Sequence, residues 1–173
     1  MLATPEKIRE YVGTELTNAQ LVERMSSIEA ALRAYTNNHF LNTNAKANGS
    51  VDNGAVKVDA EVFEVGDTVE VNHSLRSDGL YTVLAVAEGA ITLDRVPSEK
   101  GGFTVCLVQY PRDVVQAGIN MLKWSLEYGE KTGIKSETIS RWSVSYVDMD
   151  SASEGGYPRA IMTALWPYRQ AQI

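Results

Sequence analysis

The stretch FTVCLVQYPRDVVQAGINMLKWSLEY, from Phe103 to Tyr128, changes its hydrophobic period in the middle. Phe103, Val105 and Leu107 occupy alternate positions, which is the period of a β-strand. After Pro111 the apolar residues recur at helical spacing as far as Tyr128. Proline is favoured at the first position of a helix, so this stretch predicts a strand followed directly by a helix.

An opposite change of period occurs earlier in the chain. Thr17 and Gln20 have the spacing of a capping box, and an apolar stripe follows them, which predicts a helix over 17–35. The stripe consists of Leu21, Met25, Ile28, Leu32 and Tyr35. The residues from 42 to 54 are polar and rich in Asn and Gly, which predicts a mobile linker. Five strand-like runs follow, near 56–63, 67–73, 80–87, 90–95 and 103–109.

These patterns predict an α+β protein in which a β module is inserted into a helical frame. We expect residues 1–45 and 110–173 to form the frame and residues 46–109 to form the module, a five-stranded small barrel resembling an SH3 domain. The frame should also hold a short helix near 5–11, a strand over 139–147 and a short helix from Pro158 to about Trp166. Pro167 is expected to end that last helix.

The composition argues against several classes of protein. The chain has 173 residues and a net charge of −6, and the segment 51–110, with four basic and ten acidic side chains, holds the whole excess of acid. No basic patch favours tight binding of nucleic acid. No run reaches the roughly 18 apolar residues of a membrane span, and no secretory signal is visible. The single cysteine, Cys106, fits a small core residue.

No recognisable catalytic or metal-binding set is present. His39 and His73 lie apart, without cysteine or acid at ligand spacing. The acidic run from Asp148 to Asp150 lacks the rest of a calcium loop. Neither a phosphate-binding loop nor a Gly-x-Ser-x-Gly elbow occurs. We therefore expect no enzyme, no cofactor and no metal.

The aromatic residues leave two interpretations open. Trp124 and Trp142 are expected in the core. The C-terminal run Trp166, Pro167, Tyr168 and Arg169 fits a docking tail at least as well as a folded-back core segment, because Trp, Tyr and Arg are favoured interface anchors. The wide apolar arc of the helix after Pro111 indicates either a central helix of the frame or a helix whose face meets another subunit.

At the level of whole segments the chain resembles the head-tail connector proteins, also called adaptor or head-completion proteins, of long-tailed bacteriophages and prophages. The resemblance rests on the order of several segments, which are distributed over most of the chain. They are AALRAYTNN at 30–38, GDTV at 66–69 with SDGLYTV at 77–83, Tyr110-Pro111 with Gly118 and Trp124, GIKSETISR at 133–141, and GYP at 156–158 with PYR at 167–169. Compact members of the family lack the β module.

The resemblance implies a ring, typically a dodecamer, under the portal of the filled capsid. Such a ring extends the channel for double-stranded DNA without sequence-specific binding, and it docks a downstream stopper or tail-completion protein. The C-terminal segment would engage the portal protein. Localisation would be the virion, and the host cytoplasm during assembly, without membrane contact.

A ring also needs two different subunit faces, for which Arg141, Trp142 and Tyr146 are candidates. Two other functions remain open. One is a different ring component of the virion, such as a tail-completion protein. The other is a stand-alone module that binds a peptide or ligand through the β insert.

Overall fold

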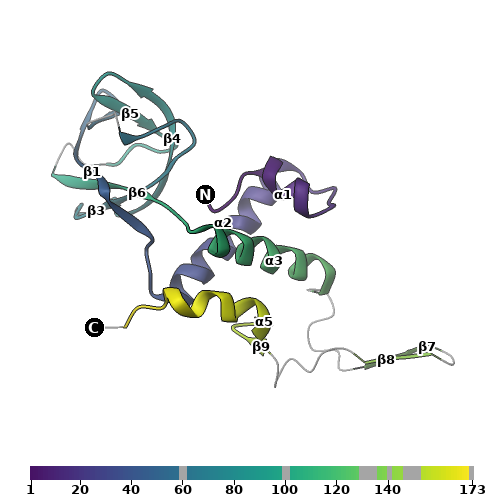
Figure 1. Cartoon of the computed structure of the whole chain (residues 1–173). Coiled ribbons are helices and arrows are strands. Elements are labelled where there is room, and N and C mark those ends of the chain that lie inside the picture. The colour runs from purple at the N-terminus through teal and green to yellow at the C-terminus, as the bar shows by residue number, and fades with distance from the viewer. Residues whose placement is uncertain (59–61, 99–101, 129–135, 140–141, 146–152, 172–173) are drawn as a thin grey trace. The chain divides into compact units, whose positions relative to one another are not determined.

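The computed structural model of the chain is of mixed α+β class and describes residues 1–58, 62–98, 102–128, 136–139, 142–145 and 153–171 (Figure 1). The chain divides into two compact units. The β unit comprises His39–Tyr110 together with Met1, and the helical unit comprises Leu2–Asn38 and Pro111–Ile173. The β unit begins at His39, ahead of the expected boundary at residue 46, because the segment that follows His39 is a strand.

Six antiparallel strands build the β unit, where the sequence predicted five. They are β1 (Leu41–Asp52), β2 (Ala55–Lys57), β3 (Thr68–Asn72), β4 (Gly79–Ala87), β5 (Ala90–Leu93) and β6 (Phe103–Val108). Their order is β1-β2-β5-β4-β3-β6, and β6 pairs with β1, so the sheet closes on itself as a barrel. Closure leaves none of the six described strands as a free sheet edge.

The segment 42–54 forms a strand up to Asp52 and a turn at Asn53 and Gly54, and is not the mobile linker that its composition predicted. It forms most of β1, which pairs with β6 and with β2. Gly49 stands opposite Phe103, and a Cβ atom at Gly49 would lie only 2.3 Å from Cε2 of the Phe103 ring. The glycine therefore makes room for a buried aromatic ring. Tertiary packing has overridden a composition that disfavours strands.

The interior of the β unit is apolar, as the alternation in the sequence predicted for Val69 and Val71. Both are fully buried. The remaining buried apolar residues of this core are Val56, Val58, Phe63, Tyr81, Val83, Ile91, Leu93, Phe103 and Val105. Alternation does not describe the other face of β3, because Glu70 is buried there too. Its Oε1 lies 2.7 Å from Nδ1 of His39.

The helical unit begins with two capped helices. Helix α1 (Pro5–Tyr11) starts at Thr4, whose side chain accepts a hydrogen bond from the Lys7 N–H. Helix α2 (Asn18–Thr36) starts at the predicted capping box of Thr17 and Gln20. The apolar stripe predicted for α2 is buried from Leu21 to Leu32. The helix ends at Asn37, which adopts a left-handed conformation.

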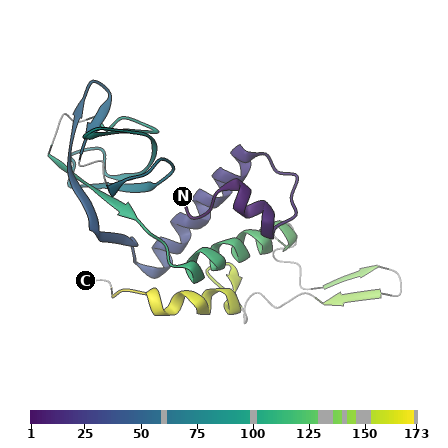
Figure 2. The same ribbon diagram turned by 45° about the horizontal axis from the view of Figure 1, so that its top comes forward.

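Helix α3 (Arg112–Tyr128) is the central helix of this unit, as one of the two interpretations of its apolar arc predicted. It packs against α2 and also against the C-terminal elements, and Figure 2 shows it running beside both. Gly118 marks a close approach, because a Cβ atom there would lie 2.2 Å from Cδ2 of Leu2. The buried Glu29 accepts a hydrogen bond from the Leu2 N–H (3.3 Å), which holds that segment in place.

The strand predicted over 139–147 is divided into two. Strands β7 (Ser136–Ile139) and β8 (Trp142–Ser145) pair antiparallel, with Ile139 opposite Trp142. Ile139 and Trp142 are three positions apart, so the alternation predicted from Trp142 onward does not extend back into β7, and the predicted range overlaps β7 only at Ile139. Only the backbone of this hairpin is described.

The chain closes with a small hairpin and two short helices. Strands β9 (Ser153–Glu154) and β10 (Tyr157–Pro158) pair, and they precede α5 (Arg159–Met162) and the 3-10 helix η3 (Thr163–Tyr168). Pro167 lies inside η3, and the prediction that it breaks the helix was wrong. The proline removes one N–H donor, while the N–H of Arg169, two residues further on, still donates to the Trp166 carbonyl at 3.2 Å.

Candidate interaction surface of the C-terminal segment

Two buried side chains anchor the C-terminal segment to the helical unit. Met162 of α5 and Leu165 of η3 are both buried, and their elements pack against α3. Helix η3 also packs against α2. Burying a leucine side chain contributes roughly 1.5–3 kcal/mol, so this attachment is substantial. The segment is therefore folded back onto its own unit, which is one of the two interpretations that the aromatic run left open.

Trp166 and Arg169 meet at one residue of α2. The indole Nε1 of Trp166 donates a hydrogen bond to the Tyr35 hydroxyl at 3.0 Å. The guanidinium carbon of Arg169 lies 5.1 Å from the centre of the Tyr35 ring, within the range of a cation–π contact. The guanidinium carbon of Arg159 lies 5.8 Å from the centre of the Trp166 ring. Each of the two aromatic rings thus has a guanidinium group near it.

Tyr168 ties the segment to α3 and to the end of α2. Its hydroxyl donates to the Asp113 carboxylate, with oxygen distances of 2.8 and 2.7 Å. Its carbonyl accepts a hydrogen bond from Nδ2 of Asn38 at 3.1 Å. The Gln170 N–H donates to the Thr36 carbonyl at 2.8 Å, so the backbone stays attached beyond η3. These bonds hold the side chains of the segment in fixed positions.

The surroundings of two tyrosines raise their pKa values. Burial is the main cause for Tyr35, and a hydrogen bond to the Glu154 carboxylate adds to it, so the pKa of Tyr35 lies above 10.0. The hydrogen bond to Asp113 is the main cause for Tyr168, whose pKa is raised likewise. A carboxylate that accepts from a phenol favours the neutral phenol. Both tyrosines are therefore neutral donors at ordinary pH.

The C-terminal surface, defined here as Tyr35, Trp166, Pro167, Tyr168 and Arg169, is preformed and open to solvent. Trp166 is 45 % exposed. Pro167 and Arg169 are exposed as well, and Tyr168 is half-buried. The sequence pointed to four of the five residues. It missed Tyr35 because nothing local relates α2 to the last turn of the chain.

The three residues considered for subunit contacts are described only in part. Arg141 and Tyr146 lie outside the described residues. Trp142 is the first residue of β8, and its place in the hairpin is known only from the backbone register. No third strand pairs with β7 or β8 in the described ranges. The hairpin therefore has two strands and no sheet partner there.

The two histidines do not form a metal site with their neighbours. His39 pairs with the buried Glu70, and His73 has a left-handed backbone with φ of 63°. Within the described ranges, no group of three or more His, Cys, Asp or Glu side chains could hold a metal ion. The acidic run 148–150 lies outside those ranges. Cys106 is buried, and burial raises the pKa of its thiol.

Comparison with known proteins does not assign the chain to a family. No protein-family profile matches the chain, and no curated protein is significantly similar to it. In the described ranges, no helix has both the length and the apolar character needed to cross a lipid bilayer.

Proposed function

We propose that the chain is a head-tail connector protein of a long-tailed bacteriophage or prophage. In this role it would form a ring under the portal, extend the DNA channel and dock the next connector or tail protein. The proposal begins from the ordered resemblance of five sequence segments to that family. The structural observation that carries it is the C-terminal surface, which offers Trp166 and Arg169 to a partner.

The C-terminal surface has the chemistry of an interface anchor. Trp, Tyr and Arg are the residues most enriched among those that dominate binding energies. A side chain that is already held in place loses little freedom on binding, and Trp166 is held by Tyr35. Trp166, Tyr168 and Arg169 therefore support contact with the portal protein, as side chains of a folded surface that could serve as a docking site.

The β7–β8 hairpin supports a contact between subunits. A hairpin of two strands is marginally stable alone in water and gains stability by packing against another element. Its backbone register pairs Ile139 with Trp142 and Glu137 with Val144. We propose that a neighbouring copy in the ring covers this hairpin, with Arg141, Trp142 and Tyr146 at or beside the contact.

The negative net charge of the chain is compatible with a component of a channel through which DNA passes without binding to the wall. A net charge of −6 gives no general attraction for phosphate groups. We propose that the protein acts without catalysis and without a cofactor, in the virion at the head-tail interface and in the host cytoplasm during assembly. For the β unit we propose an SH3-like barrel, supported by its short closed strands and apolar interior.

Co-purification with the portal protein of the same phage or prophage tests the proposal. The chain should bind the portal, and the Trp166→Ala variant should bind it more weakly than wild type does. If the chain does not bind the portal protein and binds a tail protein instead, the result would favour the alternative function of a tail-completion protein over that of a connector. Gene order beside portal and capsid genes would separate both from a stand-alone binding module.

A further inference from the structure

The strands of the β unit place its loops at two opposite ends. The chain enters the unit before β1 and leaves it after β6, and these two strands pair antiparallel, so both passages lie at one end, here called the crossing end. Strand β3 pairs with β6 in the register Val69 with Leu107 and Asn72 with Thr104. Strand β3 therefore starts at the crossing end and finishes at the opposite end, here called the far end.

The far end carries a loop, residues 73–78, that its own side chains hold rigid. Oδ1 of Asp78 accepts hydrogen bonds from the N–H and the hydroxyl of Ser74, at 2.8 and 2.7 Å. The Ser77 N–H donates to the Ser74 hydroxyl at 2.7 Å. The Tyr81 hydroxyl donates to the Ser77 carbonyl at 2.7 Å, and the Ser98 N–H donates to the Ser77 hydroxyl at 3.0 Å. The loop is thus fastened to β4 and to the segment after β5.

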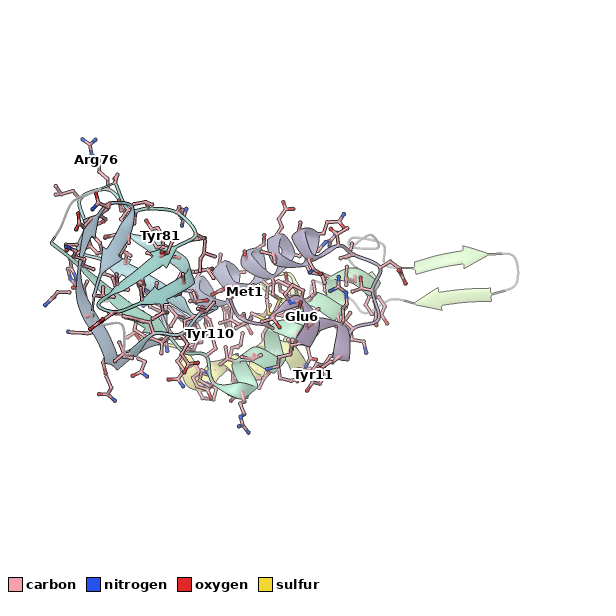
Figure 3. The ribbon with its side chains drawn as sticks, turned by 90° about the horizontal axis from the view of Figure 1, so that it is seen from above. Met1, Glu6, Tyr11, Arg76, Tyr81 and Tyr110 are labelled. Carbon is pink, nitrogen blue, oxygen red and sulfur yellow. The ribbon has the colours of Figure 1, made fainter. Side chains whose placement is uncertain are left out.

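The rigid loop presents a leucine and an arginine side by side. Leu75 is 92 % exposed, and Arg76 next to it is also exposed. Figure 3 shows Arg76 projecting from the β unit, in which Tyr81 also lies. A single exposed leucine is common on protein surfaces and needs no explanation by itself. Here a preformed loop holds the leucine beside a cation, so little order would be lost on docking.

The crossing end carries a complementary pair in the loop before β3. Val65 is 67 % exposed, and Glu64 beside it is exposed as well. The Glu64 N–H donates to Oδ2 of Asp67 at 2.8 Å, and the Gly66 N–H donates to the Val83 carbonyl at 2.8 Å. The stretch 62–67 contains acidic side chains and no basic ones. This second loop is therefore also held in place, with the opposite charge at its tip.

We infer that the far-end loop of one copy docks on the crossing-end loop of a second copy of this chain. Leu75 would lie against Val65, and Arg76 would lie beside Glu64. The contact joins two different surfaces, so it is of the head-to-tail kind, which generates a ring when the rotation between successive copies closes. The inference rests on the proposed function, because the ring supplies the high effective concentration, roughly millimolar, at which a small contact forms.

Charge reversal in the full-length chain tests this contact. Sedimentation equilibrium over a concentration series, up to the highest soluble concentration, should show weak, salt-sensitive self-association of the wild type. Arg76→Glu alone and Glu64→Arg alone should each weaken it roughly tenfold, because each places like charges together. An equimolar mixture of the two variants should associate again, because each far-end loop then meets an opposite charge. Arg24→Glu, the same charge change at an exposed position of α2, should leave association unchanged.

Three results would overturn the inference. One is no self-association of the wild type at any concentration. Another is that both single variants and their mixture associate as the wild type does. The third is a loss with Arg76→Glu and none with Glu64→Arg, which would indicate contact between two far ends. The proposed function is tested separately by portal binding, so either claim can fail while the other holds. Circular dichroism of each variant verifies that these exposed substitutions leave the fold intact.

Discussion

Trp166 donates a hydrogen bond to the Tyr35 hydroxyl at 3.0 Å, although 131 residues separate the two in the chain. The bond joins the last helical turn of the protein to the end of its second helix. A surface made in this way is present before any partner arrives. The proposed portal contact therefore depends on the fold of the helical unit as well as on the four residues from Trp166 to Arg169.

Substitutions at Trp166 and Leu165 should separate binding from stability. Leu165→Ala empties a fully buried site and should lower the free energy of unfolding by about 2–5 kcal/mol. Trp166→Ala removes a half-exposed ring, so it should lower stability less, while weakening portal binding by about 2 kcal/mol or more. Urea denaturation and a portal-binding titration measure the two quantities. Unchanged portal affinity in Trp166→Ala together with a large loss of stability would show that Trp166 serves only the fold.

Alkaline pH should destabilise the helical unit through its tyrosines. The pKa of Tyr168 is raised in the folded protein, chiefly by its hydrogen bond to Asp113, and burial raises that of Tyr157. The unfolded chain therefore releases these protons first, at about pH 10. The free energy of unfolding should be independent of these groups below that pH and should fall as pH rises through the folded-state pKa values.

The variant Tyr168→Phe tests the contribution of one hydroxyl to this pH dependence. Urea denaturation at a series of alkaline pH values should show a shallower decline for the variant than for the wild type. An identical decline in both proteins would mean that the bond to Asp113 does not affect the titration.

Gly118 should tolerate no side chain. In Gly118→Ala the new methyl would meet the buried Leu2 side chain, which must then shift, at a cost of about 1–3 kcal/mol. Gly13→Ala is the matched control, because nothing lies within 4 Å of a Cβ atom there. Thermal denaturation should show a lower melting temperature for Gly118→Ala alone. Equal melting temperatures for the two variants would contradict the close packing of Leu2 on α3.

Gly49 should be equally intolerant, for a reason in the β unit. A methyl at Gly49 would collide with the buried Phe103 ring, so Gly49→Ala should destabilise the unit by about 1–3 kcal/mol. Asn48→Ala, at the exposed neighbouring position, is the control. Hydrogen exchange followed at β1 amides should accelerate in Gly49→Ala and remain slow in the control. Fast exchange along β1 in the wild type would restore the mobile-linker interpretation.

The features that the sequence predicted correctly are local ones. The capping box of Thr17 and Gln20 and the stripe from Leu21 to Leu32 lie within a few turns of one another, so the pattern contains the whole cause. Strand β1 is different. Its Asn and Gly residues become a strand only because β6 pairs with them and the Phe103 ring fills the space over Gly49.

The candidate site was predictable in composition and not in geometry. Trp166, Tyr168 and Arg169 could be recognised by their chemistry near the end of the chain. Their partners Tyr35 and Asp113 are supplied by helices distant in sequence, and no periodicity relates such positions. Pro167 was misinterpreted for a similar reason, since a 3-10 turn held by long-range contacts accommodates a proline that would end a longer helix.

Electron microscopy of the chain mixed with the portal protein of the same phage or prophage tests the central claim most directly. We predict a ring of this protein on the portal, with the C-terminal surface at the contact, and loss of the ring with Trp166→Ala while the variant remains folded. A portal without added density, under conditions where both proteins are folded, would contradict the connector proposal.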